Sequence, residues 1–162
     1  MPVQWVNRPS LDFRGFSGTV SGGPVHQGQH VIALPSGKPS TIARIVTLDG
    51  DLDRAQPGQA VTLTLADEID VSRGDILCDA EQPASVTDQF AAHVIWMADA
   101  PMIPERQYIL KLGTQTVGAA ITELKHKINV NTLQHIAAKT LDLTDIALCH
   151  LALDQAITSD PY

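Results

Sequence analysis

The chain has 162 residues, of which 44% are hydrophobic and 18% are charged, a balance typical of a folded globular protein rather than a disordered one. Eleven Lys and Arg stand against eighteen Asp and Glu, and the resulting net charge of −7 disfavours a nucleic acid as a partner. No apolar run approaches the roughly 20 residues that a membrane-spanning helix needs.

The first half of the chain consists of short apolar or alternating runs separated by Gly, Pro and Asp. Such runs predict β-strands joined by turns. The expected strands are residues 2–6, 30–34, 40–48, 60–65 and 75–78, and the expected turns are residues 35–39 and 48–53. Helical periodicity is almost absent in this half, which favours a small barrel or sandwich over an α/β fold.

The stretch LDFRGFSGTVSGG, residues 11–23, contains four glycines and Arg14 and lies close to Arg8. It matches neither the GxxxxGK[ST] phosphate loop nor the GxGxxG dinucleotide fingerprint, because its spacing is wrong and no helix is expected after it. The glycines are therefore expected to mark a bulge, a tight turn or a close approach of two backbones at a corner of the barrel.

Residues 79–89, DAEQPASVTDQ, are polar and contain a proline, which predicts a linker. Further strands are expected after it, at residues 90–98, 107–113, 116–128 and 146–154. Residues 131–141 have helical spacing, and both a short helix and an ordered loop remain open there. The chain is accordingly expected to form two domains, residues 1–82 and 83–162.

Side chains that could carry chemistry are scattered. Cys78 and Cys149 are 71 positions apart with no signal peptide before them, which predicts two reduced thiols and a cytoplasmic protein. The six histidines form no metal-binding motif. Trp5 and Trp96 each lie in an apolar run and are expected to be core or interface anchors.

Two groups of carboxylates could perform acid–base chemistry or hold a cation. These are Asp49, Asp51 and Asp53, and Asp67, Glu68 and Asp70. Both groups lie in turn-like sequence, where Asp is favoured for local hydrogen bonding alone, so solvated turns are the preferred interpretation.

Taken together, NRPSLDFRGFSGT and ARIVTLDGDL within residues 2–77 resemble the second domain of the large, GTPase subunit of bacterial sulfate adenylyltransferase. That subunit is a translation-factor GTPase whose second and third domains are similar to the β-barrels of elongation factor Tu. The second half of the chain agrees with it in four segments: HVIWM (93–97), YILKLGTQTVGA (108–119), HKINVNTL (126–133) and DPY (160–162). The resemblance implies an all-β fold of two small β-barrels in tandem, the second of them incomplete at its C-terminal end.

One departure separates the chain from translation factors. They tend to place an arginine immediately before the GTV of this barrel, where Ser17 stands here behind Phe16. This difference favours the sulfate-activation branch. Two other hypotheses stay open at this point: a translation-factor-like fragment that binds aminoacyl-tRNA, and a free-standing enzyme that uses the carboxylates at 49–53.

The resemblance also implies a function and partners. The assembly would make adenosine 5′-phosphosulfate and pyrophosphate from ATP and sulfate, with GTP hydrolysis on the large subunit and adenylyl transfer on a small subunit. The family's nucleotide motifs belong to an N-terminal domain, so the chain is expected to be a C-terminal fragment that is inactive alone. No cofactor is expected in this chain, and GTP and Mg²⁺ are implied for that N-terminal domain.

No catalytic or metal-binding residue is therefore expected. The expected roles of the barrels are to dock the GTPase domain, hold the small subunit and relay movement between them. The residues expected to form a largely exposed docking face are Asn7, Arg8, Asp12, Arg14 and Phe16. An incomplete second barrel would leave an open strand edge, which predicts self-association through that edge.

Overall fold

The computed structural model describes residues 1–159, and this part of the chain contains strands, turns and loops but no helix. It forms two compact units. The first comprises Met1–Val86 with Leu112–Gln115 and, among the described residues, 157–159, and the second comprises Thr87–Lys111 and Thr116–Ala156. The prediction of an all-β fold is confirmed.

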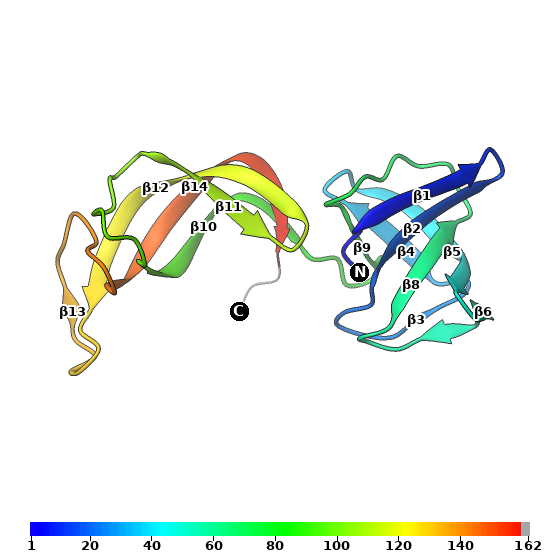
Figure 1. The fold of residues 1–162 in the computed structure, drawn as a ribbon, viewed down its shortest axis with the longest axis horizontal. Coiled ribbons are helices and arrows are strands. Elements are labelled where there is room, and N and C mark those ends of the chain that lie inside the picture. Colours follow the sequence, from blue (N-terminus) through cyan, green and yellow to red (C-terminus); the bar gives the residue numbers. More distant parts are fainter. Residues whose placement is uncertain (160–162) are drawn as a thin grey trace. The chain divides into compact units, whose positions relative to one another are not determined.

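Nine strands build the first unit (Figure 1). They are β1 (Trp5–Ser10), β2 (Phe13–Thr19), β3 (Val25–His26), β4 (His30–Leu34), β5 (Lys38–Thr47), β6 (Gly50–Leu52), β7 (Arg54–Ala55), β8 (Ala60–Leu65) and β9 (Ile76–Asp79). The main sheet has the order β1-β2-β8-β5-β4-β9, with β6 beside β5, and β3 pairs with β7.

The residues that precede β1 join the two ends of this sheet order. The amide of Val3 donates to the carbonyl of Asp75 at 2.8 Å, and the amide of Leu77 donates to the carbonyl of Met1 at 3.0 Å. The start of the chain therefore lies beside β9, and the sheet curls into a small barrel (Figure 1).

The glycine-rich stretch forms strand β2 as well as the turns around it. A Cβ atom on Gly18 would lie 2.2 Å from the carbonyl oxygen of Pro2, and one on Gly15 would lie 2.4 Å from the Cγ2 atom of Thr62. The expected close approach of two backbones is thus confirmed at Gly18, whereas Gly15 lies against a side chain. The strand that these two glycines occupy is an addition to the sequence prediction.

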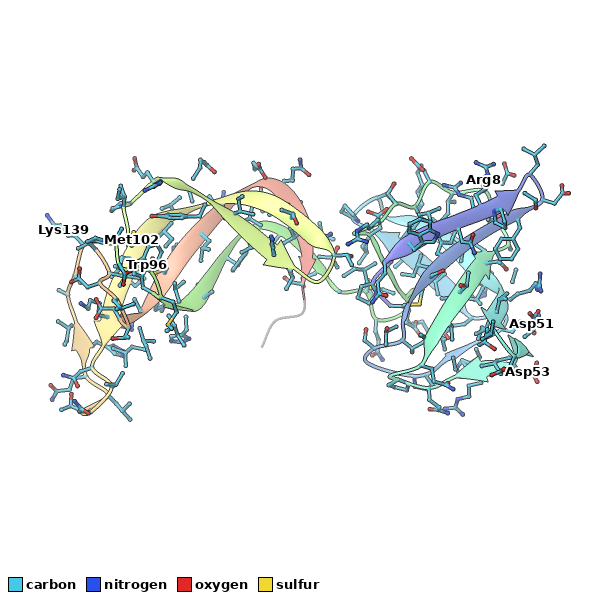
Figure 2. All side chains as sticks on the ribbon, viewed as in Figure 1. Arg8, Asp51, Asp53, Trp96, Met102 and Lys139 are labelled. Atoms are coloured by element: carbon cyan, nitrogen blue, oxygen red, sulfur yellow. The ribbon has the colours of Figure 1, made fainter. Side chains whose placement is uncertain are left out.

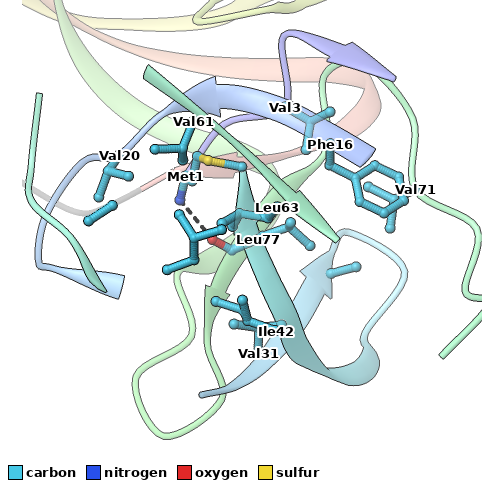
Figure 3. Close-up of a cluster of buried hydrophobic side chains, with 13 residues drawn as sticks. Met1, Val3, Phe16, Val20, Val31, Ile42, Val61, Leu63, Val71 and Leu77 are labelled. Atoms are coloured by element: carbon cyan, nitrogen blue, oxygen red, sulfur yellow. Dashed lines mark hydrogen bonds between the residues drawn. The ribbon is translucent and has the colours of Figure 1, made fainter. Parts of the chain in front are cut away.

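A single apolar cluster fills the first barrel (Figure 3). Alternate residues of β8, Val61 and Leu63, point into it, as do Ile42 and Ile45 of β5. Burying a side chain of this size contributes about 1.5–3 kcal/mol, so these residues help to drive the closing of the barrel. The amino group of Met1 donates a buried hydrogen bond to the carbonyl of Leu77 at 2.7 Å (Figure 3).

Five strands build the second unit: β10 (Ser85–Ile95), β11 (Gln107–Leu112), β12 (Gln115–Ile128), β13 (His135–Ile136) and β14 (Ile146–Ser159). Their order is β10-β14-β12-β11, with β13 beside β12. Within residues 1–159, β10 and β11 each have a strand on one side only, so this sheet is not closed. This agrees with the expected incomplete barrel, while the DPY match at residues 160–162 lies outside the described residues.

One expectation about local structure is revised, and one alternative that the sequence left open is decided. Strand β10 begins at Ser85, so only residues 80–84 separate it from β9, where a linker over 79–89 is expected from composition. The segment 131–141 is a loop that contains β13, because the Oδ1 atom of Asn129 accepts from the amides of Asn131 and Thr132 and ties the chain into a turn. Leu133, on the apolar face of the alternative helix, is 75% exposed.

The core of the second unit is small. Its buried members are Met102, Ile121, Leu141, Ala147 and Cys149, with Trp96 packed at the edge. Burial raises the pKa of the Cys149 thiol, and both cysteines are free, as expected. The Trp96 ring packs edge-on against that of Tyr108, whereas Trp5 in the first unit is 64% exposed and is not a core residue.

Two histidines that are scattered in the sequence meet in the second unit. The ring of His126 on β12 stacks on the ring of His135 on β13, with centroids 3.7 Å apart. The pKa of His126 is lowered from its ordinary value of 6.5, first by desolvation and then by the charges of His135 and His93.

This pair predicts a loss of stability in acid. Because folding lowers the pKa of His126, the folded chain binds this proton less tightly than the unfolded chain, and stability falls as the pH drops below about 6.5 toward the folded pKa. We expect an NMR titration to give His126 a pKa below that of an unfolded histidine, and His135→Gln to move it back upward. An unchanged pKa in His135→Gln would show that the ring stack has no electrostatic effect.

Candidate docking site on the first barrel

A hollow of about 300 Å³ lies in the first unit at the hairpin formed by β1 and β2. Its walls come from three places that are distant in sequence: this hairpin, Arg44 on β5, and the end of β8 with the residues that follow it. The lining residues are Arg8, Leu11, Asp12, Phe13, Arg14, Phe16, Arg44, Thr64, Leu65, Ala66, Asp67 and Glu68.

The hairpin places Arg8 and Asp12 at the rim. Ser10 pairs with Phe13, so the turn consists of Leu11 and Asp12 alone, and Leu11 is 92% exposed at its tip. The register of the two strands shifts between Asn7 and Ser10, which is a β-bulge. Bulges re-aim the side chains beside them, here the segment that carries Arg8.

The structure brings four of the five expected docking residues together around this hollow. Asp12 is exposed and Arg14 is half-buried. Arg8 is exposed near the end of β1 (Figure 2), and it makes no hydrogen bond or ion pair within residues 1–159. Asn7 is half-buried on β1 and does not line the hollow.

The expected exposure of Phe16 is wrong. Only 2% of its surface is accessible, because it pairs with Val6 on one side and Leu63 on the other and its ring enters the apolar cluster of the barrel. Phe16 therefore forms the floor below Arg14, whose guanidinium carbon lies 5.4 Å from the centre of the ring. The Nη2 atom of Arg14 also lies 3.4 Å from the Oδ1 atom of Asp70.

Arg44 also lines the hollow, but its charge is already paired with a carboxylate. Its Nε and Nη2 atoms donate to Asp51 at 2.6 and 3.0 Å, and this bidentate hydrogen bond is the main cause that lowers the pKa of Asp51 and raises that of Arg44. Asp49 and Asp53 are exposed beside it (Figure 2 labels Asp51 and Asp53). Within residues 1–159, no three His, Cys, Asp or Glu side chains are placed to hold a metal ion.

The hollow can bind another surface by charge pairing and by apolar contact. Arg8 has both its charge and its hydrogen-bond donors free, and the exposed Leu11 lies beside it. Arginine and exposed apolar residues around a shallow hollow are typical of protein interfaces. Sequence reasoning missed the wall made by Arg44 and residues 64–68, because strand pairing across the barrel brings it there and no local pattern signals that pairing.

Comparison with known proteins finds relatives whose similarity extends over the whole chain. The chain is 49% identical over 162 residues to sulfate adenylyltransferase subunit 1 of Aeromonas hydrophila, covering 100% of the chain and 34% of the relative. It is 46% identical over 162 residues to the bifunctional enzyme CysN/CysC of Xylella fastidiosa, covering 100% of the chain and 26% of that enzyme. The chain thus spans between about a quarter and a third of these relatives.

A family model and a solved structure also match this chain. Residues 89–162 match the family described as GTP-eEF1A C-terminal domain-like. The crystal structure of Sup35 complexed with GDP superposes with a TM-score of 0.87 at 15% identity, covering 99% of the chain and 40% of Sup35. This likeness shows a shared fold of translation-factor β-barrels. In residues 1–159 there is no helix with the length and apolarity needed to cross a membrane.

Proposed function

Because the whole chain is related in sequence to one third of sulfate adenylyltransferase subunit 1, we propose that it is the corresponding pair of β-barrels and works by docking and coupling. The observation that carries the proposal is the 49% identity over 162 residues to the Aeromonas hydrophila subunit. The likeness to Sup35 is at only 15% identity and bears on the fold alone, so binding of aminoacyl-tRNA has no comparable support.

The chemistry that we assign to the whole assembly is the synthesis of adenosine 5′-phosphosulfate from ATP and sulfate. A small subunit transfers the adenylyl group, and a further domain of the large subunit binds GTP with Mg²⁺ and hydrolyses it. The residues of this chain do not fit those ligands, since the sequence contains no GxxxxGK[ST] loop and residues 1–159 hold no metal-binding cluster. Docking and relay are therefore the roles assigned to the barrels themselves.

The hollow at Arg8 supplies a mechanism for docking. Arg8 carries a free guanidinium at the rim, and Phe16 and Leu63 fix the strand beneath it in the core. A rigid barrel with a charged rim can follow a neighbouring domain as a single body, so movement in that domain is passed on. We infer that a carboxylate of the GTP-binding domain pairs with Arg8 in the assembled subunit.

A chimera tests this proposal. The matching third of the Aeromonas hydrophila subunit 1 is replaced by this chain, and adenylyl transfer from ATP to sulfate is measured with the small subunit, with and without GTP. We expect GTP to stimulate the chimera. Stimulation should fall in Arg8→Glu but not in Arg54→Glu, because Arg54 is also exposed but lies outside the hollow.

Each outcome of the chimera experiment is informative. A chimera that binds the small subunit but is not stimulated by GTP contradicts the coupling role of the barrels. Equal stimulation in Arg8→Glu and Arg54→Glu removes Arg8 from the docking site but leaves the coupling role in place.

The isolated chain should not bind GTP, because the lysine and backbone amides of a phosphate loop are what hold the terminal phosphates. Isothermal calorimetry with GTP and Mg²⁺ should show no heat of binding. A dissociation constant in the micromolar range would contradict the assignment of nucleotide binding to a further domain.

The open sheet of the second unit carries a separate prediction. Strands β10 and β11 present unpaired backbone groups at the two edges of the sheet within the described residues. Exposed edges recruit strands from other chains. We expect sedimentation velocity at tens of micromolar to show dimers or larger species of the isolated chain, and a monomer at all concentrations would contradict this expectation.

A further inference from the structure

The stacked rings of His126 and His135 connect a short strand to the rest of the second unit. Strand β13 has only two residues, and it pairs with Lys127 and Ile128 near the end of β12 (Figure 1). The same two residues of β12 also pair with β14. Because a strand has only two edges, β13 covers the edge of β12 that faces away from β14.

Little apolar burial holds the segment that contains β13. Every residue from 130 to 137 is exposed, and the two large apolar residues beside the turn, Leu133 and Ile136, are 75% and 45% exposed. The apolar cluster of the second unit, among the described residues, contains none of them. A segment with so few buried apolar contacts opens at low cost, so its remaining contacts decide whether it stays paired.

The chain on both sides of this segment is held firmly. Strand β12 keeps its pairing with β14 as far as Ile128. After the segment, the carbonyl of the buried Leu141 accepts from the amide of Met102 at 2.8 Å, and the hydroxyl of Thr140 donates to the carbonyl of Met102 at 2.5 Å. The segment between these points can therefore leave β12 while the rest of the unit stays in place.

The ring stack changes its effect when it takes up protons. The centroids of the His126 and His135 rings lie 3.7 Å apart, and the ring planes are 16° from parallel. Neutral aromatic rings attract each other in such a stack. Two protonated rings place two positive charges at the same short distance, and these charges repel each other. A contact that stabilises the pairing of β13 thus becomes one that opposes it.

The groups that face His126 do not compensate a positive charge. Its partner on β14 is Leu148, which is uncharged. Desolvation lowers the pKa of His126 from its ordinary value of 6.5, and the charges of His135 on β13 and His93 on β10 lower it further. Residues 129–141, which include β13, contain no Asp or Glu. A proton on His126 therefore has no carboxylate partner in this segment.

The carboxylates close to His126 in sequence or on the facing strand are already paired. On β12, the Oε2 atom of Glu123 lies 2.9 Å from Nζ of Lys125 and 3.4 Å from Nδ1 of His150. Directly before β14, Asp145 forms an ion pair with Lys127. These pairs balance the two lysines beside the histidine and leave the histidine charges uncompensated.

We propose that His126 and His135 form a pH-sensitive latch, in which neutral rings keep β13 on β12 and protonated rings release residues 129–137 while the rest of the second unit stays folded. Histidine is suited to this role because its charge changes between about pH 5 and 8. Release uncovers the backbone of Lys127 and Ile128, which then forms a free strand edge. The latch does not depend on docking through Arg8, so the two proposals can fail separately.

Amide hydrogen exchange of the full chain, followed by NMR and corrected for the intrinsic effect of pH, tests the latch. The amide of Asn129 donates to the carbonyl of Gln134 at 2.9 Å and reports on the segment, whereas the amide of Met102 reports on the rest of the unit. Between pH 7.5 and 5.5 we expect the protection of Asn129 to fall by at least about threefold, because each proton taken up on opening changes the equilibrium by up to about tenfold per pH unit. The protection of Met102 should change less.

Histidine variants separate the latch from general unfolding in acid. Both His135→Phe and His135→Gln remove the charge, so both should lose most of the pH dependence at Asn129, and only His135→Phe keeps a stacking ring and hence the protection at pH 7.5. His150→Gln is the control, because His150 lies beside Glu123 instead, and it should keep the full pH dependence.

Three results would overturn the proposal. They are equal protection of Asn129 at both pH values in the unaltered chain, equal losses of protection at Asn129 and Met102, and full pH dependence in His135→Phe. Protection of Met102 at pH 7.5 establishes that each variant is folded.

Discussion

Replacing Phe16 by alanine is expected to destabilise the first barrel by about 3–5 kcal/mol. The ring is 2% exposed and is among the largest fully buried side chains of the described residues. Its loss leaves a cavity in the apolar cluster of the first barrel and also removes the surface on which Arg14 lies. Because a domain is stabilised by only about 5–15 kcal/mol in total, equilibrium unfolding in urea should show this change as a large shift of the first unit's transition.

A matched control for this substitution is Leu11→Ala. Leu11 is 92% exposed on the same hairpin, so its truncation should change stability by no more than about 0.5 kcal/mol. If Phe16→Ala and Leu11→Ala have similar small effects, Phe16 is not a core residue and its original interpretation as part of an exposed face must be restored.

Gly18→Ala is expected to cost about 1–3 kcal/mol, and the cost arises from backbone rather than from side-chain packing. The added Cβ atom would lie 2.2 Å from the carbonyl oxygen of Pro2, and a carbonyl cannot rotate away as a side chain can. The segment before β1 must move, and it is this segment that joins β9 through Val3 and Leu77. Hydrogen exchange of those two amides should become faster together with the loss of stability.

Gly23→Ala is the control for this glycine, because a Cβ atom there meets nothing within 4 Å and its backbone lies outside the left-handed region. It should leave both stability and exchange nearly unchanged. Normal protection of the Val3 and Leu77 amides in Gly18→Ala would show that the barrel is not held together at this point.

The strands were the predictable part of this fold. Runs such as residues 30–34 and 60–65 alternate or stay apolar over the length of one strand, and the structure places strands at those same residues as β4 and β8. The short strands β3, β6, β7 and β13 were not predicted, and neither was the longer β2. In β2, Gly15 and Gly18 weaken the strand pattern although both lie inside the strand. Glycine is needed at both positions because another segment lies close to the strand. A local sequence pattern gives no sign of such a contact.

The candidate site was predictable only in part. The hairpin with Arg8, Asp12 and Arg14 is contiguous in sequence, so its residues could be proposed together. Phe16 was assigned to the same surface because it is close in sequence, but strand β2 turns its ring inward.

The remaining features depend on long-range pairing. Arg44 and residues 64–68 reach the hollow through the pairing of β5 and β8, and His135 reaches His126 through the short strand β13. The loop at 131–141 is another case in which the local sequence pattern does not decide the structure. Its helical spacing is real, but no apolar surface covers Leu133, and hydrogen bonds to Asn129 decide its conformation.

We propose that this chain docks a GTP-binding domain through the surface around Arg8. It is tested most directly by calorimetric titration of the isolated chain with the remaining two thirds of the Aeromonas hydrophila subunit 1, for the unaltered chain, Arg8→Glu and Arg54→Glu. The account predicts binding of the unaltered chain and of Arg54→Glu, with affinity at least about tenfold lower for Arg8→Glu, as for an arginine at the centre of an interface. Equal affinities for all three chains, or no binding by any of them, would contradict it.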